Sequence, residues 1–588
     1  MNKKPIALAA MLSMGIASFP APSSAETGNI KTFPSDSELN VTMHGHYDSG
    51  AAIDAGGAEI IDYAKKNGMA YVVNGADQSL DILDVSANLK LYKKVSLSDL
   101  NLGSFEPGDL TSVAVHPSNE FVAVAIPNKV KTEDGLVAFF KANGDFIGKA
   151  EVGALPDMVT FTPDGKQLLV ANEGEPNDEV TVDPEGSVSL IDVTHGPENP
   201  TVKTVGFNKM KDSQIDEDVR SFIPGSTPAQ DFEPEYIQVT PDSKKAYVSL
   251  QENNAIAELD LSEEEFTRVH SLGFKDHSIE NNGIDASNTS EEINIKPMPV
   301  LGMHQPDAIA LYSVEGKNYI LTPNEGDARD YAGFSEEVRV KDIVEDPDAD
   351  IKLDAKNYEG FTQRELDKMV QNGLFNDDQL GRLKVTTANG KNVEGNYEAL
   401  YSYGARSFSV YETDNFKQLY DSGNEFEKVT ATALTDHFNA SNDSNEKKDR
   451  SDDKGPEPES AEVGEINGKK YAFIGLERQG GGMVYNIDQP KKPQFVTYFT
   501  SRDFSASDGT IKGDSAPEGI KFVPAEESPT GKATLLVAHE VSGTVAAYEL
   551  TDQSYDQGSK SNRLHALLDK LPVTIAEKSH SILKSLKW

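Results

Sequence analysis

The chain has 588 residues, no cysteine and a formal net charge of −41. Without cysteine it can form neither a disulfide nor a thiolate metal site. So large an acidic excess disfavours binding to nucleic acid or anionic lipid and favours divalent cations and basic surfaces, although it also promotes solubility.

The N-terminus has the features of a secretory signal peptide. Lys3 and Lys4 precede an apolar run from Ile6 to Phe19, and the small residues Ser23-Ser24-Ala25 follow. The apolar run is too short to span a bilayer stably, and no later stretch reaches about 18 uninterrupted apolar residues. The sequence therefore predicts a secreted protein with residues 1–25 removed and no transmembrane segment.

Between residues 26 and 552 one pattern recurs. An acidic or polar residue opens a short first strand, a turn leads into a very apolar second strand ending in Asn or Glu, and a third strand follows. Sharp turns such as Thr162-Pro163-Asp164-Gly165 join first to second strands. The first strands open near Glu59, Thr111, Asp157, Glu235, Asp307, Glu459 and Glu518.

Four-stranded units repeated around an axis predict an all-β fold, a seven-bladed β-propeller. The last unit has no fourth strand after Leu550, and the strand-like segment Leu39–Tyr47 has no unit of its own. We therefore expect Leu39–Tyr47 to complete the last blade and close the ring. A pair of β-sandwiches is the alternative, although it does not explain the repeated order.

Three insertions interrupt the pattern, at about 275–299, 333–398 and 436–457. The second contains a predicted helix, Thr362–Gln371, with Thr362 as its N-cap. The third is polar and charge-rich, which is the composition of a disordered segment. Residues 553–588 form a basic tail with short helical stretches, and contact with an acidic wall polymer, contact with the propeller and a solvated helix are all open.

Acidic side chains recur at one rim of the predicted propeller. In an antiparallel blade the start of the first strand lies beside the end of the second, so both face the same mouth of the central channel. Carboxylates gathered so closely raise each other's pKa unless cations neutralise them, and Ca²⁺ binds several carboxylate and amide oxygens.

The sequence therefore predicts a Ca²⁺ site with an unknown number of ions. The candidate ligands are Glu59, Asp157, Glu173, Glu235, Asp307, Asn324, Glu325, Asp327, Glu518 and Glu540. Corresponding positions hold Glu252, Glu459, Glu477, Asn74 and Asn172. The alternative is a solvated channel whose carboxylates accept hydrogen bonds from neighbouring backbone amides.

Three arginines, Arg329, Arg406 and Arg478, stand beside these strands. Arginine forms forked hydrogen bonds to phosphate, and a bound metal ion polarises a phosphoryl oxygen and acidifies a water molecule. The sequence contains no nucleophile elbow, P-loop or dinucleotide fingerprint. Any chemistry would thus be metal-assisted, with Glu325 and the three arginines as candidate catalytic residues.

Three motifs carry a family resemblance. Asn-Glu-Gly-Asp-Ala-Arg-Asp-Tyr at 324–331, Tyr-Gly-Ala-Arg-Ser-Phe-Ser at 403–409, and Ala-Pro-Glu-Gly-Ile at 516–520 with His539-Glu540 resemble the choice-of-anchor I domain family. That family overlaps the mesenchyme-specific cell-surface glycoprotein group, and the resemblance covers roughly residues 40–552. It implies an exported propeller whose relatives attach to cell surfaces by differing C-terminal devices, none of which is recognisable here. Some bacterial relatives carry alkaline phosphatase labels.

Two functions follow as hypotheses. The first is an extracellular, calcium-dependent phosphoester hydrolase, by analogy of fold with calcium-dependent phytases and phosphatases. The second is a non-enzymatic propeller that binds a cell-surface or matrix ligand. A calcium-dependent lactonase or esterase is a third interpretation. In each case we expect a monomer that is secreted or loosely associated with the cell wall.

Overall fold

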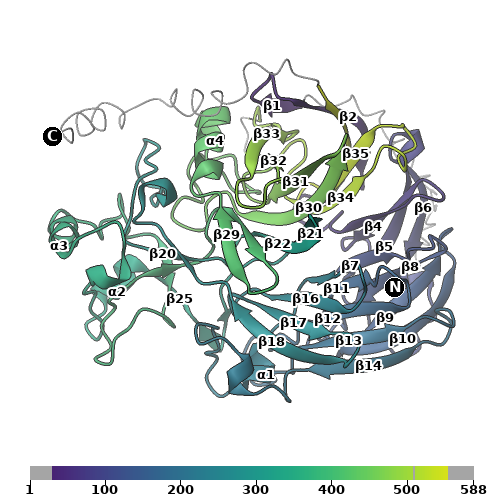
Figure 1. The fold of residues 1–588 in the computed structure, drawn as a ribbon, viewed down its shortest axis with the longest axis horizontal. Coiled ribbons are helices and arrows are strands. Elements are labelled where there is room, and N and C mark those ends of the chain that lie inside the picture. Colours follow the sequence, from purple (N-terminus) through teal and green to yellow (C-terminus); the bar gives the residue numbers. More distant parts are fainter. Residues whose placement is uncertain (1–29, 507–509, 554–588) are drawn as a thin grey trace, which may run out of the picture.

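The computed structural model describes residues 30–506 and 510–553, and the predicted signal peptide and basic tail lie outside this part. Seven sheets of four or five antiparallel strands form most of it (Figure 1). We call these sheets blades 1 to 7, in chain order of their first strands.

The strands of each blade are as follows. Blade 1 has β3 to β6 (Ile61–Ala64, Met69–Asn74, Ser79–Asp84, Lys90–Ser96), blade 2 has β7 to β10 (Ser112–Val115, Phe121–Ile126, Asp134–Lys141, Phe146–Ala154), and blade 3 has β11 to β14 (Pro156–Phe161, Gln167–Asn172, Ser187–Asp192, Thr201–Gly206). Blade 4 has β15 to β18 (Ile237–Val239, Lys245–Leu250, Ala255–Asp260, Glu265–Ser271), and blade 5 has β21, β22, β28 and β29 (Ala310–Val314, Lys317–Pro323, Phe408–Glu412, Lys417–Asp421). Blade 6 has β30 to β33 (Pro458–Ile466, Lys469–Leu476, Gly482–Asn486, Gln494–Thr500) and β1 (Lys31–Phe33), and blade 7 has β34 to β36 (Pro517–Val523, Ala533–His539, Thr544–Asp552) and β2 (Leu39–Asp48).

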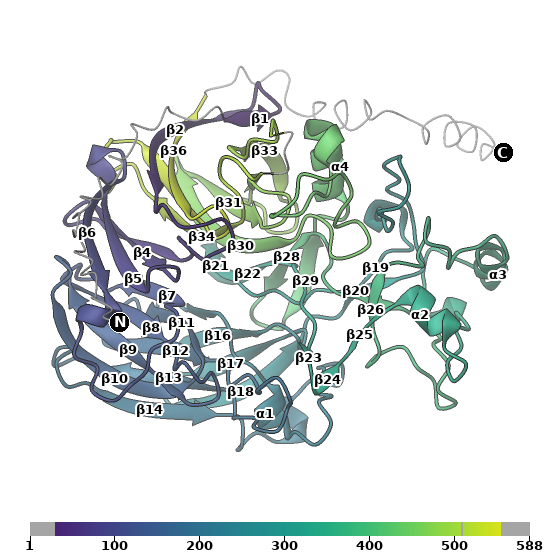
Figure 2. The ribbon, with the colours of Figure 1, turned by 180° about the vertical axis from the view of Figure 1, so that it is seen from behind.

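The blades are arranged radially. Their first strands contact one another in the order β3, β7, β11, β15, β21, β30, β34 and back to β3, which makes a closed ring around a central axis. Each blade packs against the next through both faces, so its second strand is largely apolar, and every residue of β35 is buried. The predicted all-β propeller is confirmed, and Figure 2 shows the same arrangement from behind.

The two ends of the propeller sequence meet in blade 7. Strand β2 pairs with β36 in register from Leu39 opposite Asp552 to Asp48 opposite Thr544. The sequence-based expectation that Leu39–Tyr47 completes the last blade is therefore confirmed. Strand β1 continues the same segment onto blade 6, where it pairs with β33.

The first two insertions fold together into one module beside blades 4 and 5 (Figure 1). Its elements are β19 (Phe274–Asp276), β20 (Leu301–Met303), β23 (Asp330–Tyr331), β24 (Phe334–Ser335), β25 (Glu337–Arg339), α2 (Val340–Glu345), α3 (Gln363–Gln371), β26 (Lys384–Thr386) and β27 (Tyr401–Ser402). Met298 from the first insertion and Leu366 and Leu383 from the second share its core. Helix α3 begins after Thr362 with a capping box to Glu365, which confirms the predicted helix.

The third insertion is ordered, so the expectation of disorder is wrong. It follows helix α4 (Glu425–Ala433) and packs over blades 5 and 6. The Arg406 guanidinium donates to the backbone carbonyls of Ser451 and Asp453, and Arg502 donates to that of Ser441. Buried arginines from the blades thus fix a segment whose composition alone is typical of a solvated loop.

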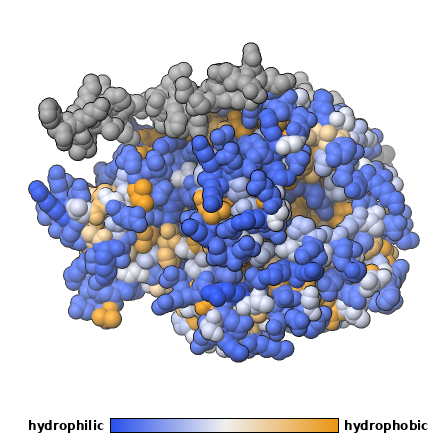
Figure 3. Space-filling model, in the orientation of Figure 1, coloured by the Kyte–Doolittle hydropathy of each residue, from blue (hydrophilic) through white to orange (hydrophobic). Residues whose placement is uncertain are grey.

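The short helix α1 (Pro228–Asp231) lies just before blade 4. No helix in residues 30–506 and 510–553 has the length and apolarity needed to cross a membrane. The face shown in Figure 3 is mostly hydrophilic, with scattered apolar patches, as expected for so acidic a chain.

Closure by β2 gives a testable expectation. Leu39 is 1% exposed, packed between blades 6 and 7. Leu39→Ala should lower the free energy of unfolding by about 2–5 kcal/mol because it leaves a cavity at the closure. The exposed Thr42 on the same strand is the matched control, and Thr42→Ala should cost less than about 0.5 kcal/mol in urea unfolding. Equal effects of the two changes would contradict the closure role.

Candidate functional site

The acidic residues that open the first strands surround the central channel. We call Glu59, Asp157, Glu235, Asp307, Glu459 and Glu518 the axial ring. The channel cavity has a volume of about 170 Å³, and its lining includes Asp157, Asp307, Glu459 and Glu518. Glu59 and Glu235, from blades 1 and 4, lie close to these residues. The charge of Glu59 raises the pKa of Glu518, and the charge of Asp307 raises the pKa of Glu235. The predicted convergence at one mouth is therefore what the fold produces.

Local backbone irregularities position these side chains. In blades 3, 6 and 7 a proline pairs with the end of the second strand. The register then shifts, and pairing resumes three residues later on the first strand and two residues earlier on the second. The acidic residue follows the proline directly, at Asp157, Glu459 and Glu518, and so lies in the bulge. A bulge re-aims a side chain, and proline at a strand start costs no ladder hydrogen bond. The Pro-acid pair thus directs the carboxylate toward the axis.

The axial ring is enclosed but has no cationic partner: Glu235 is buried, and the other five members are partly buried. In the described ranges, 30–506 and 510–553, none of its six members forms an ion pair with lysine or arginine. One carboxylate oxygen each of Glu235, Asp307, Glu459 and Glu518 is buried without a hydrogen-bond partner. A buried charge without partners is costly, so the ring requires protons or cations.

The pKa values reflect that cost. Burial, reinforced by Glu540, Asp109 and Asp157, raises the pKa of Glu59 to about 8. Burial raises the pKa of Asp157 to about 7. Burial and the neighbouring carboxylates also raise the pKa values of Glu235, Asp307, Glu459 and Glu518 well above their usual range.

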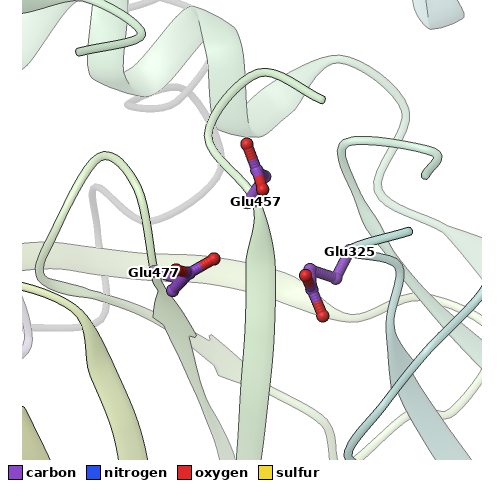
Figure 4. A group of neighbouring side chains, drawn as sticks. All are labelled: Glu325, Glu457 and Glu477. Carbon is purple, nitrogen blue, oxygen red and sulfur yellow. The ribbon is translucent and has the colours of Figure 1, made fainter. Parts of the chain in front are cut away.

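A second group of carboxylates lies where blades 5 and 6 meet. We call Glu325, Glu457 and Glu477 the paired triad (Figure 4). Their oxygens lie within 4.8 Å of one another, a spacing that would suit a metal ion. Within the described ranges no other trio of potential ligands is so compact.

The paired triad already holds its cations. Lys454 Nζ lies 3.2 Å from Glu325 Oε1 and 3.1 Å from Glu457 Oε2. Arg450 and Arg478 pair with Glu457 at 2.8 and 3.3 Å, and Arg478 reaches Glu477 at 3.1 Å.

The remaining oxygens of the triad accept hydrogen bonds from side-chain amides. Gln251 donates to Glu325, and Asn442 donates to Glu477. Although burial opposes it, Lys454, Arg450 and Arg478 lower the pKa of Glu457 to about 2. Burial raises that of Glu477 to about 8 against the effect of Arg478. Since every oxygen has a partner and three cations face three carboxylates, we favour the ion-pair interpretation of this group over a metal site.

Several predicted ligands have other surroundings. The buried Asn324 amide donates to the hydroxyls of Ser407 and Ser409 within blade 5. Asp327 is 55% exposed and lies 3.7 Å from Lys454. Glu540 lies near Glu59 and Arg478, beside the axial ring. Glu173 lies between Asp157 of the axial ring and a second group that contains Glu233 and Glu252.

The three predicted arginines also differ. Arg406 is buried away from the axis, where it pairs with Glu427 at 2.7 Å and holds the third insertion. Arg329 is buried against Glu233 at 3.1 Å. Arg478 is 30% exposed, at the mouth. Of the three, Arg478 therefore has the position that a phosphate could reach.

Sequence reasoning did not include Lys454, Glu457 or Glu233 in the site. Lys454 and Glu457 lie in the insertion that was expected to be disordered. The signal for Glu233 and Glu457 was a shared motif, because each precedes a Pro-Glu pair that opens a first strand, at 234–235 and 458–459.

A β-propeller with a buried carboxylate ring at the mouth of its channel is thus the class that the fold and site define. The chain belongs to the choice-of-anchor I domain family, whose sequence model matches residues 59–490.

Two curated relatives are similar over shorter stretches. Gigasin-3a of Magallana gigas is 32% identical over 189 residues, which cover 30% of this chain and 66% of the relative. The mesenchyme-specific cell surface glycoprotein of Strongylocentrotus purpuratus is 27% identical over 284 residues, which cover 45% of this chain and 33% of the relative. The chain therefore spans less than two thirds of the length of either relative.

Solved structures give weaker likenesses. Hydrazine synthase of Kuenenia stuttgartiensis has a TM-score of 0.42 at 12% identity, covering 86% of this chain and 98% of that one. The β-propeller domain of Cps50 (Swd1) from Myceliophteria thermophila has a TM-score of 0.37 at 9% identity, covering 87% and 100%.

The axial ring predicts an unusual pH dependence in chelator-treated protein. Acids whose pKa is raised on folding stabilise the fold below their unfolded pKa, and that stabilisation is lost as pH rises through the folded pKa. With folded pKa values of about 8 for Glu59 and about 7 for Asp157, stability should fall between about pH 5 and pH 8. Thermal unfolding at several pH values measures this, and Glu59→Gln should flatten the slope. A melting temperature that rises over this range would contradict the burial of these charges.

Proposed function

We propose that the protein is an extracellular or cell-surface propeller that binds a divalent cation of the calcium type on its axial ring. The observation that carries this proposal is the ring itself, which gathers six carboxylates without an ion-pair partner among the described residues, four of them with a buried and unbonded oxygen. Family membership and the cell-surface relative support the location. The signal-peptide prediction, on residues outside the described part, points the same way.

The spacing of the ring suggests how an ion would be held. Among the described residues only the paired triad brings three carboxylate oxygens within 4.8 Å, so the ring oxygens stand farther apart. An ion on the axis would accordingly keep part of its water, with carboxylates binding directly or through water. Ca²⁺ accepts six to eight oxygens in flexible geometry, which suits a wide ring better than the strict octahedron of Mg²⁺.

Calorimetric titration of chelator-treated protein with Ca²⁺ tests the axial ring. Glu518→Gln removes one ring charge at a position influenced by Glu59, Asp157 and Asp307, and should weaken binding at the axial site at least tenfold. Binding should also weaken from pH 8 to pH 5, because protons compete for the ring. The exposed Glu151 on β10 provides the control, and Glu151→Gln should leave the affinity within about twofold. No difference between the two variants would remove the ring as the site.

The non-enzymatic role fits the arginines better than hydrolysis does. Arg406 and Arg329 are buried in protein contacts, so two of the three predicted phosphate ligands are already engaged. What the propeller face would bind is a surface or matrix ligand, with the cation fixing the charge and shape of the mouth.

Phosphoester hydrolysis is the second candidate. One observation favours it, namely the partly exposed Arg478 beside the ring. A ring-bound cation would polarise a phosphoryl oxygen and acidify a water molecule, while Arg478 would hold the phosphate.

Assays with a phosphate monoester separate the two functions. As a hydrolase, the protein would show turnover that requires Ca²⁺ and falls about 100-fold in Arg478→Met. Arg268→Met is the control, because Arg268 lies exposed on strand β18 of blade 4, where it pairs with Asp216. Calcium-loaded protein without turnover would leave the binding propeller as the function.

A further inference from the structure

A cluster at blades 3 and 4 occupies positions equivalent to those of the paired triad. We call Glu173, Glu233 and Glu252 the lateral triad. Glu173 and Glu325 each follow a second strand within Asn-Glu-Gly, Glu233 and Glu457 each precede a Pro-Glu pair that opens the next first strand, and Glu252 and Glu477 each follow the second strand of that next blade. The two triads are therefore the same three fold positions in different blades.

The two triads differ in their cations. The paired triad faces Lys454, Arg450 and Arg478. The lateral triad has one arginine, Arg329, which lies 3.1 Å from Glu233 and 4.0 Å from Glu252 and also faces Asp231 at 3.5 Å. Among the residues that the structure describes, no lysine occupies the position corresponding to Lys454, and nearby Lys131 pairs with Glu175 at 2.7 Å.

The lateral triad is buried yet incompletely bonded. Glu233 is 0% exposed, and neither of its carboxylate oxygens has a hydrogen-bond partner. One oxygen of Glu252 is likewise buried and unbonded. Burial and the neighbouring acids raise the pKa of Glu173 and Glu233, and burial raises that of Glu252 to about 7. The three carboxylates and Asp231 are opposed by Arg329 alone, which leaves a negative charge that a divalent ion would reduce.

We propose that the lateral triad binds a divalent cation of the calcium type in the place that the Lys454 ammonium takes in the paired triad. Lys454 draws its carboxylates within 4.8 Å of one another. The lateral triad does not bring three oxygens within that distance in the described ranges, so a bound ion would have to draw them together. This site uses none of the axial-ring residues, although Glu173 and Glu252 lie close enough to raise the pKa of Glu235. Separate substitutions in each set therefore test the two sites.

The test is calcium titration by calorimetry on the full chain after chelation. Wild-type protein should show two classes of binding event. Glu233→Gln should abolish one binding event or weaken its Ca²⁺ affinity at least tenfold. The matched change Glu457→Gln should leave both affinities within about twofold, because Glu457 is already paired with cations. Thermal unfolding in chelator checks that Glu233→Gln keeps the fold although it removes one of the carboxylates that face Arg329.

The outcomes separate the two sites. Loss of one Ca²⁺-binding event in Glu233→Gln and of the other in Glu518→Gln supports both the lateral and the axial site. If Glu233→Gln retains every wild-type event within twofold, the lateral site is overturned, whatever Glu518→Gln shows. If Glu233→Gln fails to fold, Lys454→Met carries the test. It should gain a binding event by exposing the equivalent triad, and no gain would count against the proposal.

Discussion

The structure depends on one constraint, which is that radial repetition places the same strand position of every blade on a common axis. A residue type that suits the start of one strand is therefore multiplied around the channel. Here that residue is acidic in six of the seven blades, and the Pro-acid bulges turn its side chain inward. Negative charge accumulates in a partly enclosed channel, which raises the pKa values of these carboxylates.

The chain meets this need in two ways. At blades 5 and 6 it supplies the cation covalently, as Lys454 on an insertion anchored by Arg406. Along the axis the carboxylates have no such partner in the part of the chain that the structure describes, and at blades 3 and 4 Arg329 alone faces Glu233 and Glu252. An internal lysine fixes the charge permanently, whereas an external ion makes it depend on the surroundings.

The fold could be read from the sequence because blade packing buries both faces of each strand and leaves a strong, repeated apolar signal. The convergence of Glu59, Asp157 and Glu518 was also predictable, since it follows from topology alone. The partners of Glu325 and Arg406 were not, because both depend on an insertion that its composition misrepresented. Arg406 satisfies backbone carbonyls of that insertion, and no local pattern reports which distant carbonyls an arginine will reach.

The joining of β2 and β36 has a consequence for how the protein is made. These strands come from opposite ends of the propeller sequence, so their pairing is among the most non-local contacts in the molecule. Blade 7 cannot be completed until its last strand has been synthesised. Until then the flanks of blades 1 and 6 present unpaired apolar surface, which exposes the nascent chain to aggregation and proteolysis. The acidic character of the chain keeps such open intermediates apart during that interval.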